Sequence, residues 1–268
     1  VRESEKVDAH PYLDKPYAKV SRWQGCFAGK NREKLETEIL PKYYLGSRWF
    51  GGKARTVIRV TIADTIPVEG MAHAKLLITE VSYASGENER YQLPVSFVSD
   101  AEVSSSDDNF YVRAIARVVL GEEEGYLCDA TYEQGFLGQL FHLVTGCAEW
   151  KGKLGNVNGV KGEAFDQLCR IDGSGSEPVL LGNEQSNTSI RYRDDLCLKL
   201  YRRIEIGVSP EVEMCRALTE KTSFRQLPDY LGSLDYAQNR TSRYSIGILQ
   251  CFVPNEGDAW KLSLDYVQ

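Results

Sequence analysis

Hydrophobic and polar residues alternate most regularly around position 200. The alternating residues are Leu196, Cys197, Leu198, Lys199, Leu200 and Tyr201. Because successive side chains of a β-strand point to opposite faces, this pattern predicts a strand with the leucines on one face and Lys199 on the other. Burying a lysine stem beside a sheet is costly unless its ammonium meets an anion, whereas an edge-strand lysine can extend to water. The pattern alone leaves both possibilities open.

A helix is predicted to begin shortly after this strand. Ser209 offers an N-cap hydroxyl, Pro210 suits the first helical position, and Glu211 places an acid in the first turn. Glu213 lies beside the expected buried stripe of Val212, Cys215 and Leu218. In kinase folds a glutamate of this helix orients the lysine that faces the nucleotide phosphates. Glu213 therefore either pairs with Lys199 or is a solvated helix residue.

Elsewhere the pattern predicts a mixture of strands and helices. Residues 75–83 and 91–98 flank a Ser-Gly-Glu-Asn turn and are typical of a hairpin. The other expected elements are a helix at 32–45, a strand at 56–66, helices at 109–119 and 136–144, and a glycine-rich loop at 152–162. The fold class is therefore predicted to be α+β, with residues 1–20 forming an irregular polar lead-in.

Composition excludes several classes of protein. The chain has 268 residues, 42% of them hydrophobic and 26% charged, which is ordinary for a globular protein with a sizeable core. A net charge of −6 argues against a nucleic-acid surface, and no apolar run is long enough to span a membrane. The seven cysteines show no CxxC spacing and the three histidines are scattered. We therefore expect a cytoplasmic protein with reduced cysteines and without a metal site in this chain.

Five segments together resemble the maltokinases, bacterial enzymes that make maltose 1-phosphate from maltose and ATP. Glu-Gln-Ser-Asn-Thr-Ser at 184–189 is similar to their phosphate loop, 198–203 to their lysine strand and 210–213 to the following helix. Arg-Trp-Phe-Gly-Gly-Lys-Ala-Arg at 48–55 resembles the opening of their N-terminal cap, and 250–260 resembles the hinge and the segment after it. The lead-in at 23–41 looks like kinases fused behind a trehalose synthase.

The resemblance implies a domain organisation and a nucleotide site. We expect a linker from an upstream domain at 1–21, a strand-rich cap at 22–125, a protein-kinase-like N-lobe of a small antiparallel sheet plus helix at 126–254, and the truncated start of a C-lobe at 255–268. ATP is the implied cofactor, together with Mg²⁺ held by the absent C-lobe. The implied nucleotide-binding residues are Gln185, Ser186, Asn187, Thr188, Ser189, Lys199, Glu213, Gln250, Cys251, Phe252 and Val253.

Catalytic residues are not expected in this chain. The family's His-Gly-Asp-type catalytic loop has no counterpart in the sequence, so we expect the chain to supply the nucleotide lobe and to be inactive alone. Two alternatives remain: a non-catalytic kinase-like interaction module, or a related kinase for another sugar. Arg202 and Arg203 either serve phosphate or flank a strand, and Trp49 is interpreted as core packing.

Overall fold

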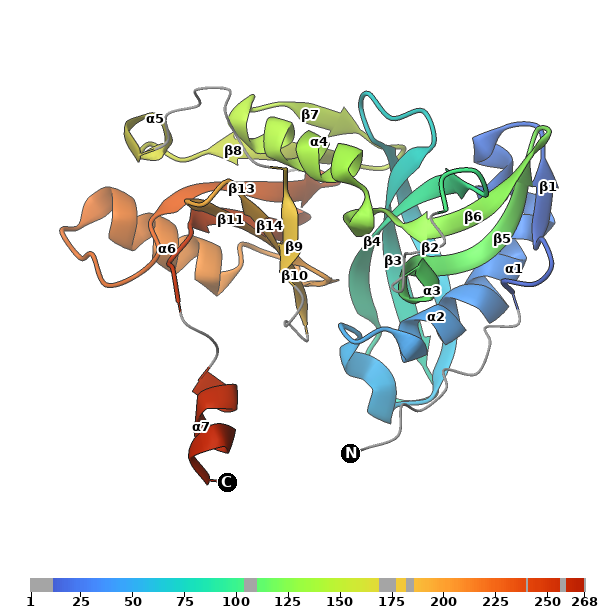
Figure 1. The fold of residues 1–268 in the computed structure, drawn as a ribbon, viewed down its shortest axis with the longest axis horizontal. Helices are drawn as coiled ribbons and strands as arrows, with labels where there is room; N and C mark the ends of the chain where they lie inside the picture. Colours follow the sequence, from blue (N-terminus) through green and yellow to red (C-terminus); the bar gives the residue numbers. More distant parts are fainter. Residues whose placement is uncertain are drawn as a thin grey trace.

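The structure, a computed structural model, describes residues 12–103, 110–168, 177–181, 186–239, 241–255 and 259–267. Within these residues the strands form two seven-stranded sheets that lie next to each other (Figure 1). Among the described strands, β1 (Ala18–Val20) pairs in parallel with β5 (Ala114–Leu120), and the other pairings are antiparallel. The fold is therefore mixed, rich in strands and with few helices.

The first sheet has the strand order β1-β5-β6-β4-β3-β2, and β12 also pairs with β4. Its further strands are β2 (Val57–Pro67), β3 (Ala74–Tyr83), β4 (Glu89–Ser99), β6 (Glu123–Asp129) and β12 (Arg203–Ile204). One face is covered by a helical segment made of α1 (Gly29–Lys34), a π-helical turn (Leu35–Ile39) and α2 (Leu40–Gly46). The hairpin expected at 75–98 and the helix expected at 32–45 are confirmed.

The second sheet has the order β7-β8-β13-β14-β11-β10-β9. Its strands are β7 (Glu149–Lys151), β8 (Asn156–Lys161), β9 (Val179–Leu181), β10 (Asn187–Tyr192), β11 (Leu196–Tyr201), β13 (Tyr230–Ala237) and β14 (Arg243–Cys251). Helix α4 (Gln134–Thr145) packs on one face, where the Tyr192 hydroxyl donates to the Leu137 carbonyl at 2.7 Å. Helix α6 (Pro210–Lys221) packs on the other face, whereas α7 (Ala259–Val267) stands apart (Figure 1).

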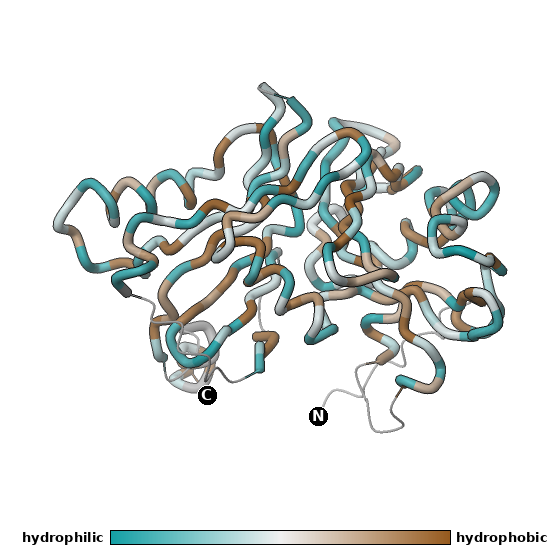
Figure 2. The backbone as a smooth tube through the Cα atoms, turned by 90° about the horizontal axis from the view of Figure 1, so that it is seen from above, coloured by the Kyte–Doolittle hydropathy of each residue, from teal (hydrophilic) through white to brown (hydrophobic). Residues whose placement is uncertain are grey.

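The chain crosses from the second sheet to the first directly after β11, because β12 pairs with β4. Hydrogen bonds from Gln92 of β4 stabilise the segment that connects the two sheets. Its side-chain amide donates to the carbonyls of Tyr201 and Ile246 at 2.7 and 2.6 Å, and its backbone amide donates to Arg202. One hydrophobic cluster then runs through both sheets, joining residues such as Ile66 of β2 to residues of β11. Figure 2 shows hydrophobic and hydrophilic stretches alternating along the backbone, with several of the outermost turns hydrophilic.

Two secondary-structure predictions are wrong. The helix expected at 109–119 is confined to α3 (Phe110–Arg113), and 114–120 forms β5, because an apolar run without clear periodicity takes the structure that its partners offer. The glycine-rich segment expected to be a loop contains β8 instead. A Cβ on Gly159 would lie 1.7 Å from the Leu143 carbonyl oxygen, so glycine here permits close contact with α4 rather than flexibility.

The N-terminal lead-in also differs from expectation in its described part. Tyr17 and Ala18 are buried against the first sheet, and β1 pairs with the edge of that sheet. Residues 12–21 are thus part of a folded unit rather than a linker, because these few apolar residues find a sheet edge. The expected boundary at residue 125 falls inside β6, whose pairing with β4 and β5 continues to Asp129.

Candidate functional site

Strand β11 separates its side chains as the alternation predicts. Leu196, Leu198 and Leu200 are at most 1% exposed and face the shared core. Lys199 lies on the other face, with 26% of its side chain exposed. The half-buried ammonium therefore points away from the hydrophobic core, toward the face on which α6 packs.

The ammonium of Lys199 is paired with Glu211 of α6. Its Nζ lies 3.1 Å from Glu211 Oε1, and the Tyr201 hydroxyl donates to Glu211 Oε2 at 3.0 Å. Burial, followed by the nearby charge of Glu211, raises the pKa of Tyr201, so this hydroxyl remains a donor. The carboxylate of Glu211 thus binds both Lys199 and Tyr201 on this face of β11.

The prediction that Glu213 pairs with Lys199 is therefore wrong. Residues two apart on an α-helix differ by about 200° around the axis, so Glu211 and Glu213 cannot both face the sheet. Glu213 is exposed, whereas Cys215, one turn after Glu211, is partly buried. Residues four apart share a helix face, so Glu211 lies on the same face as Cys215. Because Cys215 belongs to the predicted buried stripe, the sequence already favoured Glu211 over Glu213 as the residue that faces the sheet.

Cross-strand pairing brings Ser189 and Gln250 to the same face as Lys199. Ser189 of β10 lies opposite Lys199, and Gln250 of β14 lies opposite Cys197, and directly opposed residues project to one side of a sheet. The Gln250 side-chain amide donates to Cys215 Sγ at 3.3 Å. Burial, with a smaller contribution from Glu211, raises the pKa of the Cys215 thiol. The face thus combines a cation, a carboxylate, a hydroxyl and an amide.

The residues expected in the phosphate loop do not all lie together. Ser186 is exposed, Asn187 is half-buried, and Gln185 lies outside the described residues. Thr188 lies opposite Leu200, which places it on the leucine face, away from Ser189 and Lys199. Of these residues, Ser189 is the one that lies directly opposite Lys199.

The expected hinge begins with the last two residues of β14, Gln250 and Cys251. The Cys251 amide donates to the Asp229 carbonyl at 3.0 Å, and the Phe252 amide donates to the Asp195 carbonyl at 2.7 Å. Val253 is 54% exposed, and its amide has no hydrogen bond among the described residues. Burial raises the pKa of the Cys251 thiol to about 11. The amides of Cys251 and Phe252 are thus already used by the chain itself.

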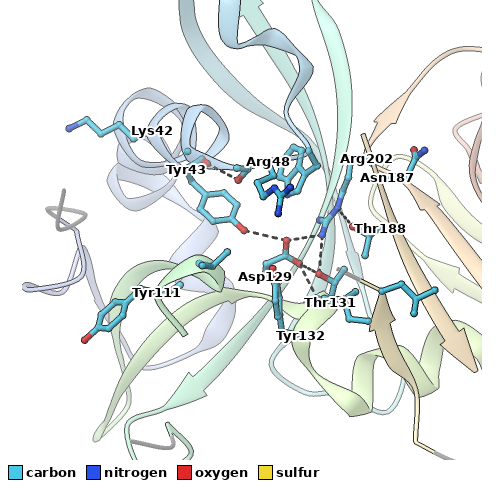
Figure 3. A pocket seen from close by; sticks show the side chains of 17 residues that line it. Lys42, Tyr43, Arg48, Tyr111, Asp129, Thr131, Tyr132, Asn187, Thr188 and Arg202 are labelled. Carbon is cyan, nitrogen blue, oxygen red and sulfur yellow. Dashed lines mark hydrogen bonds and ion pairs between the residues drawn. The ribbon is translucent and has the colours of Figure 1, made fainter. Parts of the chain in front are cut away.

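A buried ion pair was not expected from the sequence. Arg202, just after β11, lies 2.9 Å from Asp129, and the two side chains are 2% and 1% exposed. Arg202 also donates to the hydroxyls of Thr188 and Thr131 at 2.7 and 2.9 Å. Of the two interpretations offered for Arg202, flanking a strand is confirmed, since Arg202 lies between β11 and β12, and its side chain also joins the two sheets (Figure 3). Asp129 is 73 positions earlier in the chain, so no local pattern reveals the pair.

Trp49 packs as predicted, among aromatic rings of the first sheet and α2. Its ring centroid lies 4.9 Å from that of Tyr44 and 6.0 Å from that of Tyr91. The guanidinium of Arg202 lies 5.0 Å from the Trp49 ring centroid, within the range of a cation–π contact. Trp49 therefore also supports the buried arginine.

Residues 43–133 match the family model of the maltokinase N-terminal cap domain. The resemblance to maltokinases is thus confirmed for this segment. Among solved structures, a glucosamine kinase in complex with glucosamine, ADP and inorganic phosphate has 13% identity and a TM-score of 0.42, covering 78% of this chain and 39% of that one. A glucosamine kinase in crystal form B has 14% identity and a TM-score of 0.37, covering 88% and 43%. The chain spans about two fifths of these proteins.

Neither a candidate membrane-spanning helix nor a candidate metal-binding cluster occurs among the described residues. None of the helices in this part of the chain combines the length and apolar character needed to cross a membrane. The described His, Cys, Asp and Glu side chains likewise form no group of three or more that is suited to holding a metal ion.

Proposed function

We propose that this chain is the N-terminal part of an ATP-dependent maltokinase, which converts ATP and maltose to ADP and maltose 1-phosphate. It supplies the nucleotide-binding lobe of a protein in which the kinase follows a trehalose synthase domain. The cap extends through β6, the kinase-like lobe runs from about residue 130 to 254, and 255–268 begin the C-lobe. The observation that carries this proposal is the ion pair between Lys199 and Glu211.

The arrangement of the second sheet supports a kinase-type lobe. In protein kinases the conserved lysine is on the third strand and pairs with a glutamate of the helix that follows. Here β9, β10 and β11 are consecutive antiparallel neighbours, Lys199 is on the third of them, and α6 supplies Glu211. Strand β14, which leads into the expected hinge, lies directly beside the lysine strand.

The residues on the Lys199 face fit a nucleotide. The ammonium, already oriented by Glu211, supplies positive charge for the phosphates, and the hydroxyl of Ser189 lies on the same face. At the hinge, the amide of Val253 is the donor left for a base edge, because those of Cys251 and Phe252 are engaged. ATP supplies the transferable phosphoryl group. We place the Mg²⁺ ligands on the C-lobe.

Nucleotide binding by this chain tests the proposal most directly. Titration with a fluorescent ATP analogue should give saturable binding that Lys199→Met weakens at least tenfold, because the variant removes the phosphate-facing charge. Lys30→Met changes an exposed lysine of α1 and is the matched control. Equal binding by wild type and Lys199→Met would contradict the nucleotide site. Complete absence of binding would favour the non-catalytic interaction module.

Activity assays test the rest of the proposal. The chain alone should release no ADP with maltose and Mg²⁺, because positioning and electrostatic terms worth orders of magnitude in rate are supplied by the catalytic loop. A longer protein that includes the C-lobe should be active. Comparing maltose with glucosamine as acceptor in that protein separates a maltokinase from a related sugar kinase. Turnover by the chain alone would show that the active site is misplaced.

A further inference from the structure

A cavity of about 240 Å³ lies where the two sheets meet (Figure 3). It is bordered by the turn after α2, by the segment Ala130–Tyr132 and by the start of β10. At about 30 Å³ per water molecule, this volume corresponds to roughly eight waters and is sufficient for a small ligand. Asn187 and Thr188 line it, whereas Ser189 and Lys199 do not, so this cavity is separate from the Lys199 end of the proposed nucleotide site.

A buried donor in the cavity wall lacks an acceptor. Arg202 is 98% buried, since 2% of its side chain is exposed. Its Nε and Nη2 are engaged with Thr188, Thr131 and Asp129, but its Nη1 has no hydrogen-bond partner among the described residues. A buried donor left in this state costs about 1–3 kcal/mol. An acceptor oxygen held in the cavity would remove this cost after a small shift of the side chain.

A second guanidinium lies near the first. Arg48 lines the same cavity from the turn after α2, is exposed to solvent, and forms no ion pair within the described part of the chain. Figure 3 shows Arg48 projecting toward the space that Arg202 and Tyr43 border. Two planar guanidinium groups on one cavity suit an oxyanion, because each can donate two parallel hydrogen bonds to its oxygens.

The carboxylate in the cavity wall cannot satisfy both arginines. Asp129 Oδ1 accepts from the amide and the hydroxyl of Thr131, and Oδ2 accepts from Tyr43 at 3.3 Å and contacts Arg202. Among the described residues that line the cavity, Asp129 is the one carboxylate and balances one of the two arginines, which leaves one positive charge. Lys42 at the rim, whose ammonium lies 4.9 Å from the Tyr12 ring centroid, adds a second. A phosphate ester, with a charge of about −1.5 to −2, matches this surplus.

We propose that the cavity between Arg48 and Arg202 binds a small phosphate-bearing molecule. The site lies between cap and lobe and includes Thr188, which belongs to the strand that also carries Ser189. The bound phosphate would take hydrogen bonds from Arg48 and from Nη1 of Arg202, with the aromatic rings that line the cavity beside the rest of the ligand. This inference does not require the proposed kinase activity.

Calorimetric titration of the whole chain with inorganic phosphate and with glucose 6-phosphate tests the proposal. Both should bind with a dissociation constant of about 1 mM or lower, whereas glucose and chloride should not bind. Arg48→Gln should weaken binding at least tenfold while leaving the melting temperature unchanged, because Arg48 is exposed. Arg225→Gln, which removes an exposed arginine on another part of the surface, should bind phosphate normally.

Two further variants separate this site from the nucleotide site. Arg202→Lys keeps the charge but removes the planar donors, so it should reduce phosphate affinity in whatever fraction remains folded. Lys199→Met should bind phosphate as the wild type does. Unchanged affinity in Arg48→Gln, loss of phosphate binding in Lys199→Met, or equal binding of acetate and phosphate would overturn the proposal, and so would no phosphate binding up to 20 mM, a limit about twentyfold above the expected constant.

Discussion

Asp129 and Arg202 form an ion pair that lies almost entirely out of solvent, with 2.9 Å between a carboxylate oxygen and a guanidinium nitrogen. Asp129 ends β6 of the first sheet, and Arg202 follows the lysine strand of the second. Charges buried this deeply are tolerated when their remaining hydrogen-bonding groups are also satisfied. Tyr43, Thr131 and Thr188 satisfy most of these groups. The pair therefore connects β10, through Thr188, to β6 of the first sheet, through Asp129.

Removing the charge of Asp129 should destabilise the protein strongly. We expect Asp129→Asn to lower the free energy of unfolding by about 3–5 kcal/mol, because Arg202 would then be a buried charge without compensation. Asp166→Asn is the control, since the Lys161–Asp166 pair has a 74% exposed carboxylate and should contribute about 1 kcal/mol or less. Urea denaturation measures both. A loss below 1 kcal/mol in Asp129→Asn would show that the surroundings relax around the arginine.

The choice between Glu211 and Glu213 can be tested by a matched pair of substitutions. Glu211→Gln should weaken nucleotide binding by roughly three- to tenfold, because the ammonium of Lys199 loses its orienting charge but remains partly solvated. Glu213→Gln, two positions further along the same helix, should have no effect. The titration used for Lys199→Met gives both affinities. Equal losses in the two variants would instead indicate a general effect of charge on α6.

Glu36 should make stability depend on acid pH. Burial opposes ionisation of this carboxyl, but hydrogen bonds from Arg59, the Ile62 amide and Arg32 outweigh burial and lower its pKa below the usual 4.5. A lowered folded-state pKa contributes stability that is present above the unfolded-state value and is lost as the pH falls through the folded-state value.

Glu36→Gln should therefore cost about 1–3 kcal/mol at pH 7, and the difference from wild type should shrink as the pH falls below 4.5. Melting temperatures measured between pH 3 and 7 (about the range over which a carboxyl titrates) give this comparison. Glu33→Gln, whose carboxylate is 70% exposed, is the control and should leave the profile unchanged. A constant difference at all pH values would assign the effect to packing.

Gly159 should not tolerate a methyl group. Gly159→Ala forces a Cβ against the Leu143 carbonyl, so we expect a loss of about 1–3 kcal/mol from overpacking. Gly138→Ala, on α4 itself, meets nothing within 4 Å and should stabilise the protein by about 0.5–1 kcal/mol through helix propensity. Opposite shifts in melting temperature are therefore expected. A stabilising effect of Gly159→Ala would mean that α4 packs less closely on β8.

Local sequence predicted the elements whose periodicity is strong. The alternation around Lys199 gave the correct strand and the correct faces, and the helix beginning at Pro210 was expected from its N-cap and proline. It did not identify β5, because Ala114–Leu120 is an apolar run equally suited to a helix. Only its pairing with β1 and β6, which depends on distant residues, makes it a strand.

In the candidate site, too, residues on regular elements were predictable, whereas residues whose role depends on distant partners were not. Lys199 was found because its strand is regular, whereas the choice of Glu213 over Glu211 was an error of about half a helical turn that the predicted stripe could have corrected. Thr188 was assigned to the phosphate loop with its neighbours, but strand alternation sends it to the other face. Asp129 and Thr131 carried no local signal, because their role depends on an arginine about 70 positions away.

Strand β12 determines where the first sheet can be divided. The segment that matches the cap family ends at residue 133, but the edge of β4 near Tyr91 is completed by Arg203 and Ile204. A cap excised at that boundary would leave unpaired backbone groups on β4, and such an open edge invites aggregation. The first sheet is therefore complete only where residues 203–204 belong to the same folded unit as the segment that matches the cap family.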